Sequence, residues 1–375
     1  MTILTPNLND QWLIVRSLFE AAASLASVSQ KAFLDFACPC AEIRKEVELL
    51  LAADQHVDSS ALPADRIEEV SASAAQPTPV IAGYRLDEII GMGGSGTVYS
   101  AISIEQNRRV AIKVMHAHSI GRPAAIRFRQ ECTALARLSH PNIVRLIESG
   151  ICQSGNSYLV MEFISGTPAD QWATKCKPSV GRAIEMIQCV LSALAHSHHA
   201  GIVHRDIKPS NVIVDSSGLP KLLDFGVARL VNSEGKRTGF HTETGNLVGT
   251  FAYMSPEQAT GCGDQVGVQS DIYQVALMLF ELLTGQLPYE NHGGSAAAVF
   301  RAVLLDPRVS LSQLRPDLAG SLCDLLQSAL SVDPALRPQS IRDFESQLAQ
   351  AVQILALRNP HLDIQSQFPS LKVSA

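Results

Sequence analysis

The stretch GIVHRDIKPSNVIV, residues 201–214, restricts the possible folds of this chain more than any other part of the sequence. Both of its apolar runs, Ile202-Val203 and Val212–Val214, are predicted to be short buried strands. Between them stand five polar or charged residues: His204, Arg205, Asp206, Lys208 and Asn211. Burying charge without a partner costs free energy. These side chains must therefore face solvent or serve a ligand that is itself charged.

The composition indicates a folded protein with a large core, since 46 % of its 375 residues are hydrophobic. The net charge of −6 gives no support for nucleic-acid binding, which uses basic surfaces. The eight cysteines include no CxxC pair, which favours reduced thiols over a disulfide framework or a zinc site. We expect no secretory signal, because the first residues lack a basic region followed by an apolar core, and no apolar run is long enough to span a membrane. We expect a cytoplasmic protein.

The chain divides into four segments by pattern. Residues 1–70 are predicted to form a small helical region, because apolar residues recur there at helical spacing. Residues 71–83, rich in Ser, Ala and Pro, are predicted to be a linker. Residues 84–350 begin with strand-like patterns and turn mostly helical, whereas 351–375 is predicted to be a C-terminal tail. This order predicts an α+β fold, with a β-rich lobe, an α-rich lobe and a cleft between them.

The segment IGMGGSGTVYS, residues 90–100, carries glycines in a GxGxxG arrangement at Gly91, Gly93 and Gly96. Such glycines can simply make a hairpin turn. A strand-like run follows them, whereas a dinucleotide-binding fingerprint needs a helix, and the lysine of a P-loop is missing. The remaining functional interpretation is a glycine hairpin whose backbone amides approach phosphates, with Val98 as an apolar lid.

Two charged residues occur inside apolar elements. Lys113 lies in the apolar strand 110–115, and Glu131 lies on the apolar face of a helix predicted over about 123–138. Lys113 could reach water from an edge strand, and Glu131 could lie at the margin of its apolar stripe. Their occurrence on neighbouring elements favours a pair that holds Lys113 in place, although such pairs are weak evidence for stability. Lys113 could then bind phosphate oxygens.

The remaining acidic and amide groups suit a metal and a reacting hydroxyl. Asp206 and Asn211 are five residues apart with Lys208 between them, and Asp224 follows an apolar run directly. Mg²⁺ prefers oxygen ligands and bridges phosphates, so Asn211 and Asp224 are the predicted metal ligands. Asp206 is then free to orient or deprotonate a hydroxyl. Lys208 could neutralise charge on a transferring phosphoryl group.

Taken in order, these motifs resemble the Hanks-type protein kinase family, and especially its bacterial, eukaryotic-like serine/threonine members. The resemblance covers about residues 84–350. The matching motifs are GMGGSGTV at 91–98, VAIK ending at Lys113, Glu131, HRDIKPSN at 204–211, DFG at 224–226 and SPE at 255–257. It implies a two-lobed kinase fold with ATP between the lobes, and transfer of the ATP γ-phosphoryl group to serine or threonine of protein substrates. The implied cofactor is Mg²⁺, with Mn²⁺ as a substitute.

The resemblance also implies an ATP-binding set. Met161 would be the gatekeeper, residues 162–164 the hinge, and Ala111 and Ile213 would enclose the adenine. The complete set is Ile90, Gly91, Met92, Gly93, Gly94, Ser95, Gly96, Val98, Ala111, Lys113, Glu131, Met161, Glu162, Ile164 and Ile213. Lys208 and Thr250 resemble the serine/threonine class rather than the tyrosine class.

By the same resemblance, residues 224–257 form an activation segment. Thr242 and Thr244 are its candidate phosphorylation sites, because Arg205 could pair with a phosphate there and order the loop. The alternative is that both are ordinary solvated loop threonines. The helices before the linker could dock a partner, mediate a homodimer or pack on the main body.

The chain departs from the family pattern at a few positions. SPE replaces the commoner APE, and Gln274 and Ala276 stand where relatives usually carry Ser and Gly. We expect the last two changes to affect packing rather than chemistry. Asp271 and Arg337 match structural positions of the family, and Arg337 is expected to pair with Glu257.

Two other functions stay open at this point. One is a catalytically silent scaffold that binds nucleotide or partners, and the other is a kinase of small molecules. The first is disfavoured because no catalytic position of the motif set is missing. The second is disfavoured because the family uses the region of Thr250 and SPE to receive peptides.

Overall fold

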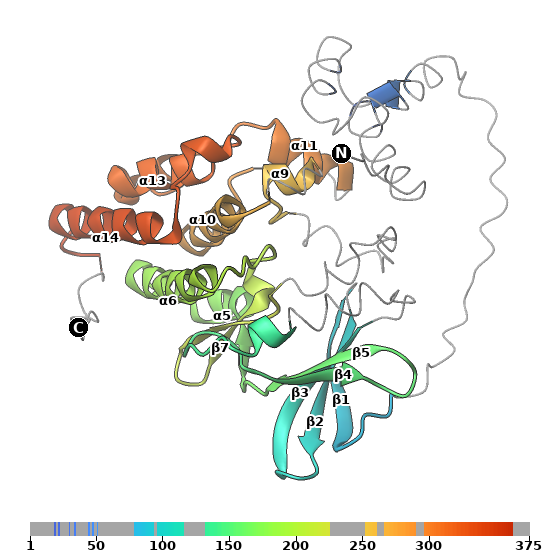
Figure 1. Cartoon of the computed structure of the whole chain (residues 1–375). Helices are drawn as coiled ribbons and strands as arrows, with labels where there is room; N and C mark the ends of the chain where they lie inside the picture. The colour runs from blue at the N-terminus through green and yellow to red at the C-terminus, as the bar shows by residue number, and fades with distance from the viewer. Residues whose placement is uncertain are drawn as a thin grey trace.

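The computed structural model describes residues 79–93, 96–115, 132–225, 252–260, 266–289 and 296–362, together with isolated residues before residue 52. The described part forms a strand-rich lobe and a helix-rich lobe (Figure 1). This confirms the predicted two-lobed α+β fold. Apart from those isolated residues, the predicted helical region 1–70 lies outside the described residues, as does most of the linker.

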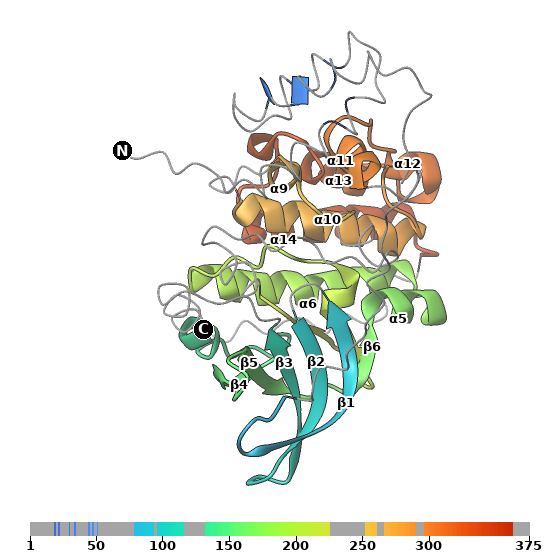
Figure 2. The same cartoon turned by 90° about the vertical axis from the view of Figure 1, so that its right-hand side faces the viewer.

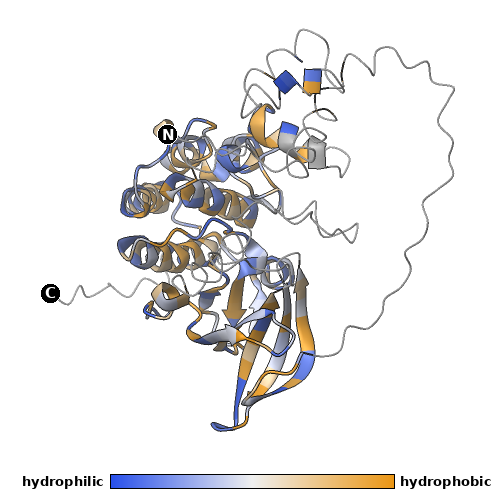
Figure 3. Ribbon diagram, turned by 45° about the vertical axis from the view of Figure 1, so that its right-hand side comes forward, coloured by the Kyte–Doolittle hydropathy of each residue, from blue (hydrophilic) through white to orange (hydrophobic). Residues whose placement is uncertain are grey.

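The strand-rich lobe is one antiparallel sheet with the order β1-β2-β3-β5-β4. Its strands are β1 (Tyr84–Gly93), β2 (Gly96–Ser103), β3 (Arg108–Met115), β4 (Leu146–Ile151) and β5 (Ser157–Glu162). Hydrophobic and hydrophilic residues alternate along these strands (Figure 3), as expected when a strand presents different side chains to its two faces. On β3, Val110, Ile112 and Val114 join a buried cluster. Ala111 and Lys113 therefore share the opposite face.

The turn between β1 and β2 brings the backbone of β2 against β3. A Cβ atom on Gly96 would lie 2.5 Å from the carbonyl oxygen of Val114. No side chain fits at that distance, so this position requires glycine.

A second, small sheet lies in the helix-rich lobe, with the order β6-β7-β8. Its strands are β6 (Gly166–Pro168), β7 (Val212–Asp215) and β8 (Pro220–Leu222). The predicted strand at Val212–Val214 is therefore confirmed. The predicted strand at Ile202-Val203 is wrong, since residues 202–208 form no strand. Side chains of α10 bind the backbone N–H groups of His204, Arg205 and Ile207, which a strand would have offered to a neighbour.

The helices follow the strands in sequence. They are α5 (Ala169–Cys176), α6 (Val180–His199), α9 (Pro256–Ala259), α10 (Val268–Thr284), α11 (Ala296–Leu304), α12 (Leu311–Leu314), α13 (Ser321–Ala329) and α14 (Ile341–Arg358). Short 3₁₀ turns are η1 (Pro209–Asn211), η4 (Pro316–Leu318) and η5 (Pro334–Leu336). In Figure 2, α6 lies between the large sheet and α10, and α9, α11, α12 and α13 lie beyond α10. Among the described residues, no helix is both long and apolar enough to cross a membrane.

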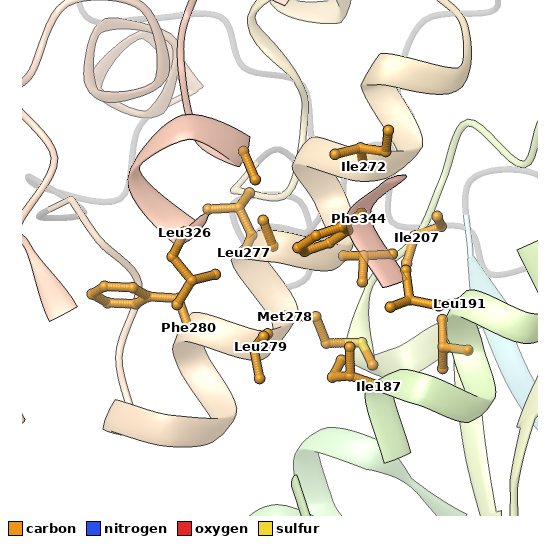
Figure 4. Packing of buried hydrophobic residues seen from close by; sticks show 14 of the residues in the cluster. Ile187, Leu191, Ile207, Ile272, Leu277, Met278, Leu279, Phe280, Leu326 and Phe344 are labelled. Carbon is orange, nitrogen blue, oxygen red and sulfur yellow. The ribbon is translucent and has the colours of Figure 1, made fainter. Parts of the chain in front are cut away.

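The core of the helical lobe is centred on α10, where every residue from Ser270 to Phe280 is buried. A helix that is buried all round belongs in the middle of a core. The side chain of Ile207, in the irregular segment 202–208, packs into this core from the side of α6 (Figure 4). Because Ile207 is 0 % exposed, it anchors the neighbouring Asp206 to the buried core of the lobe.

Candidate active site

A pocket opens between the two sheets. Its lining residues are Ile90, Val98, Ala111, Val144, Met161, Glu162, Phe163, Ile164, Ile213, Leu223 and Asp224. The structure thus brings together predicted residues from the glycine hairpin, from β3, from the end of β5 and from β7. Most of the lining is apolar, with Asp224 at one edge, as a site for a flat base attached to a charged tail would require.

The strand pairing explains why these side chains meet. Ala111 of β3 pairs with Met161 of β5, and Val98 of β2 pairs with Lys113. Paired residues of neighbouring strands point to the same face of a sheet. One face of the large sheet packs on the buried cluster. The opposite face therefore carries Val98, Ala111, Met161 and Lys113 together.

Val144 and Leu223 also line the pocket, and they were not predicted from the sequence. The N–H of Val144 donates to the carbonyl oxygen of Leu222, at 3.0 Å. This bond brings together two segments that are far apart in the chain. The sequence signal for Val144 was the apolar pair Ile143-Val144 after His140-Pro141-Asn142. The residue that binds Val144 lies on β8, and local pattern does not predict that contact.

The glycine hairpin closes the pocket from the large sheet. Gly91, Met92 and Gly93 end β1, and Gly93 pairs with Gly96 at the start of β2. Met92 is 68 % exposed and so contributes little to the core. Gly94 and Ser95 lie outside the described residues.

Lys113 forms an ion pair with Asp224. Its Nζ lies 2.6 Å from Oδ2 of the aspartate, and its side chain is only 9 % exposed. Asp224 has a φ of +49°, in the left-handed region that is uncommon for residues other than glycine. Such conformations cluster at functional sites. The predicted partner of Lys113, Glu131, lies outside the described residues, as do Gly226, Thr242, Thr244 and Thr250.

Asp206 is the centre of a second polar group. Its Oδ2 accepts a hydrogen bond from Nδ2 of Asn211 at 2.9 Å and lies 3.1 Å from Nζ of Lys208. The same Nδ2 also donates to the backbone oxygen of Asp206, at 2.7 Å. Because the amide nitrogen of Asn211 is directed at Asp206, its oxygen Oδ1 is left to bind another group.

His204 links the two polar groups. Its Nε2 lies 2.7 Å from the carbonyl oxygen of Leu223, and its Nδ1 accepts from the N–H of Asp206. A neutral imidazole with its proton on Nε2 satisfies both bonds. Complete burial lowers the pKa of His204, although nearby carboxylates oppose that effect. Phe225 packs against the imidazole, with 4.7 Å between the ring centroids.

Asp271, on α10, binds the backbone of the irregular segment 202–208. It is 0 % exposed, and its carboxylate accepts from the N–H of His204 and of Arg205 at 2.8 and 2.7 Å. Nε2 of His198 lies 2.7 Å from the same carboxylate. The expected structural role of Asp271 is confirmed.

The expected pair between Arg337 and Glu257 is confirmed as well. Two guanidinium nitrogens lie 2.9 Å from the two carboxylate oxygens, and both side chains are almost fully buried. Burial alone would raise the pKa of Glu257, but the hydrogen bonds and charge of Arg337 outweigh it and lower the pKa. This pair fastens the end of the SPE motif to the rest of the lobe.

Gln274 was expected to affect packing rather than chemistry, and the structure adds a polar contact to that expectation. Its Oε1 accepts from the N–H of Ile207 at 2.9 Å. The side chain therefore binds the backbone beside Asp206.

The polar residues fit a hard divalent cation. Asn211 and Asp224 offer an amide oxygen and a carboxylate next to the apolar pocket. Among the described residues, no group of three or more His, Cys, Asp or Glu side chains could hold a metal ion. Mg²⁺ does not need such a cage, because it keeps water ligands and binds one or two protein oxygens together with substrate phosphates.

Comparison with known proteins places these observations in a family. The model of the protein kinase domain matches residues 84–351. The chain is 38 % identical over 269 residues to a probable serine/threonine-protein kinase PknB of Lactococcus lactis, covering 71 % of this chain and 41 % of the relative. It is 35 % identical over 273 residues to the serine/threonine-protein kinase pkn3 of Myxococcus xanthus, covering 71 % and 49 %. The chain therefore spans less than half the length of these curated relatives.

Solved structures give the same result. The kinase domain of Mycobacterium tuberculosis PknI matches with a TM-score of 0.55 and 28 % sequence identity. The match covers 72 % of this chain and 97 % of that structure. With a family model that spans most of the chain and a fold that agrees, the chain belongs to the protein kinase domain family, in the company of bacterial serine/threonine kinases.

Proposed function

We propose that this chain transfers the γ-phosphoryl group of ATP to serine or threonine hydroxyls of proteins. The observation that carries the proposal is the convergence of Lys113, Asp206, Lys208, Asn211 and Asp224 beside one apolar pocket. A charged tail attached to a flat apolar base is the ligand that this combination suits. The names of the relatives support the same activity, which those longer proteins carry.

The adenine of ATP would bind in the apolar part of the pocket. Ala111 and Ile213 come from different sheets and would enclose the ring from its two faces. Residues 162–164 would bind its edge through backbone groups, as the family resemblance implies. Lys113 would then bind phosphate oxygens, because its stem is buried and its charge lies at the polar edge of the pocket.

Asp206 would orient the acceptor hydroxyl and take its proton. The carboxylate is held by Asn211 and Lys208, so it is fixed in direction before a substrate arrives. Fixing a reacting group in this way removes much of the entropic cost of the transfer step. Lys208 would neutralise charge that develops on the transferring group.

Asn211 and Asp224 would hold Mg²⁺. When bound, the ion neutralises phosphate charge and holds the phosphates in a fixed position. Mn²⁺ suits the same oxygen ligands. The Lys113–Asp224 ion pair keeps the carboxylate directed toward the pocket.

The activation segment offers a regulatory proposal. Arg205 has a φ of +66°, and its buried Nε has no hydrogen-bond partner among the described residues. A phosphate on Thr242 or Thr244 would satisfy this guanidinium and order the segment. Mass spectrometry of active protein that finds both threonines unmodified would contradict this proposal. A homodimer also stays a prediction.

The activity is tested with radiolabelled ATP and a generic basic protein as acceptor. The wild type is expected to label the acceptor on serine and threonine, and the Asp206→Ala variant is expected to show no labelling above background. Equal labelling by both proteins would overturn the proposal. Nucleotide binding without labelling by the wild type would instead indicate a scaffold.

A further inference from the structure

Two glutamine side chains are buried beneath the segment that carries Asp206. Gln258, on α9, is 9 % exposed, and Gln274, on α10, is 2 % exposed. Nε2 of Gln274 donates to Oε1 of Gln258 at 2.9 Å. A buried amide without partners costs free energy, but each of the four side-chain polar atoms here has a partner.

The outer ends of this amide pair bind the backbone on both sides of Asp206. Nε2 of Gln258 donates to the carbonyl oxygen of Arg205 at 2.7 Å. Oε1 of Gln274 accepts from the N–H of Ile207 at 2.9 Å. The pair thus spans the residues that immediately precede and follow Asp206.

The two peptide groups that flank Asp206 are consequently bound at both ends. In the first, the Arg205 carbonyl binds Gln258 and the Asp206 N–H binds His204. In the second, the Asp206 carbonyl binds Asn211 and the Ile207 N–H binds Gln274. The orientation of these peptide planes sets the direction of the Cα–Cβ bond of Asp206. Half of the bonds that fix the planes come from the two glutamines.

A serine at position 274 could not make the same connection. Its hydroxyl is closer to the backbone, and it lacks an amide group that accepts from one partner while donating to another. One member of the pair also lies next to the activation segment, because Gln258 directly follows the SPE motif at the end of that segment. It therefore connects the region that would receive the peptide to the residue that would accept its proton.

We propose that the Gln258–Gln274 amide pair positions Asp206 for the transfer step and couples it to the end of the activation segment. The inference rests on the proposed kinase activity and deepens it. Both glutamines are positioning residues, since neither lines the nucleotide pocket. Their loss should slow the transfer and leave nucleotide binding intact.

The test uses the full chain and the variants Gln258→Met, Gln274→Met and the double variant. Methionine has a similar length and cannot make these bonds. Each single variant is expected to lower kcat by roughly tenfold to a hundredfold, because small displacements of a reacting group are costly. Affinity for ATP, measured by titration calorimetry, should change by less than about twofold. The substitutions leave unchanged the contacts that bind ATP equally in the ground state and in the transition state. The kcat of the double variant should be little lower than that of the more impaired single variant, because the effects of substitutions within one network are not additive.

Hydrogen exchange gives a readout that does not depend on activity. In Gln274→Met, the Ile207 amide should exchange faster than in the wild type, because it loses its acceptor. The control is Gln313→Met, on α12, which removes a similar bond to the N–H of Ser310. Its kcat and the exchange of residues 204–208 should match the wild type.

The outcomes are separable. If the wild type labels an acceptor and Asp206→Ala does not, while both methionine variants retain wild-type kcat, the positioning role is overturned. If ATP affinity falls as much as kcat, the pair merely supports the fold. If Gln258→Met does not fold, Gln274→Met carries the test, because it removes the bond to the Ile207 N–H and the bond to Gln258 together. A wild type without activity would refute the proposed function instead.

Discussion

Nζ of Lys113, on β3, lies 2.6 Å from Oδ2 of Asp224, although 111 residues separate them in the chain. The pair joins the large sheet to the residue that follows β8. Both lobes therefore contribute to one charged group beside the apolar pocket. A change in the distance between the lobes would change this contact directly.

Replacing Lys113 with methionine keeps the stem of the side chain and removes its charge. We expect kcat/KM for phosphoryl transfer to fall about a hundredfold or more, because a fixed charge aimed at developing charge contributes that much in other enzymes. Steady-state kinetics with varied ATP measure the effect. The matched control is Arg182→Met, since Arg182 also forms an ion pair, with Glu185 at 2.8 Å. Equal losses in both variants would contradict a specific role for Lys113.

Asn211→Ala should increase the requirement for Mg²⁺. The variant loses one of two protein oxygens that would bind the ion, and losses of this kind change metal affinity by about tenfold to a hundredfold. The Mg²⁺ concentration for half-maximal rate should rise accordingly, and chelation with EDTA should abolish transfer by the wild type. The control is Asn156→Ala, in the turn before β5. A variant of Asn211 with an unchanged Mg²⁺ titration would exclude it as a metal ligand.

Arg337→Met should lower the free energy of unfolding by about 3–5 kcal/mol, because it leaves the carboxylate of Glu257 buried without its partner. Urea denaturation measures the loss. The double variant Glu257→Gln/Arg337→Met should be less destabilised than Arg337→Met alone, because no unpaired charge remains. If both variants lose the same free energy, the lost packing of Arg337, not the unpaired charge, explains the effect.

The same pair predicts a dependence of stability on pH. Arg337 holds the pKa of Glu257 below its usual value of 4.5 in the folded protein. The unfolded chain therefore binds this proton first as the pH falls. The stabilisation is complete above about pH 4.5 and is lost as the pH drops through the folded pKa. The unfolding free energy of Glu257→Gln should depend less on pH in that range than that of the wild type.

Most of the fold follows from local pattern, whereas several site residues do not. The sequence predicts β7 because Val212–Val214 is a short apolar run. The strand prediction fails at Ile202-Val203, because the backbone N–H of His204 donates to the side chain of Asp271, 67 residues away in the sequence. Gln274 was assigned to packing for a similar reason. Its amide contacts Ile207 and Gln258 only because the fold brings them to it, and no spacing rule contains that information.

The predicted motif residues lie within strands of the two sheets or in the chain next to them. Asp224 follows β8, Asn211 precedes β7, and Lys113 lies within β3. Strand ends can be located from sequence with moderate accuracy. The direct contact of Lys113 with Asp224 needs the two sheets to face each other, which depends on packing between lobes.

Glu281 supplies a last prediction that no sequence pattern suggests. The residue lies on α10, and its carboxyl accepts a hydrogen bond from the hydroxyl of Tyr253. Burial, and then the negative charge of Asp170, raise its pKa from the usual 4.5 to about 7. The folded protein thus disfavours the ionised form. Stability should fall as the pH rises from about 4.5 to about 7, because the folded state binds the proton more tightly than the unfolded state.

Glu281→Gln removes this titration and keeps an oxygen for Tyr253. At pH 8 the variant should be more stable than the wild type by up to about 3 kcal/mol, since each pKa unit corresponds to 1.36 kcal/mol. At pH 4 the two proteins should differ little, because both side chains are then neutral. The control Asp324→Asn, at an exposed position on α13, should shift stability by no more than about 0.5 kcal/mol at either pH. Urea denaturation at the two pH values decides the matter: if Glu281→Gln is no more stable than the wild type at pH 8, the carboxylate is stabilised in place by its surroundings, and burial does not dominate at this position.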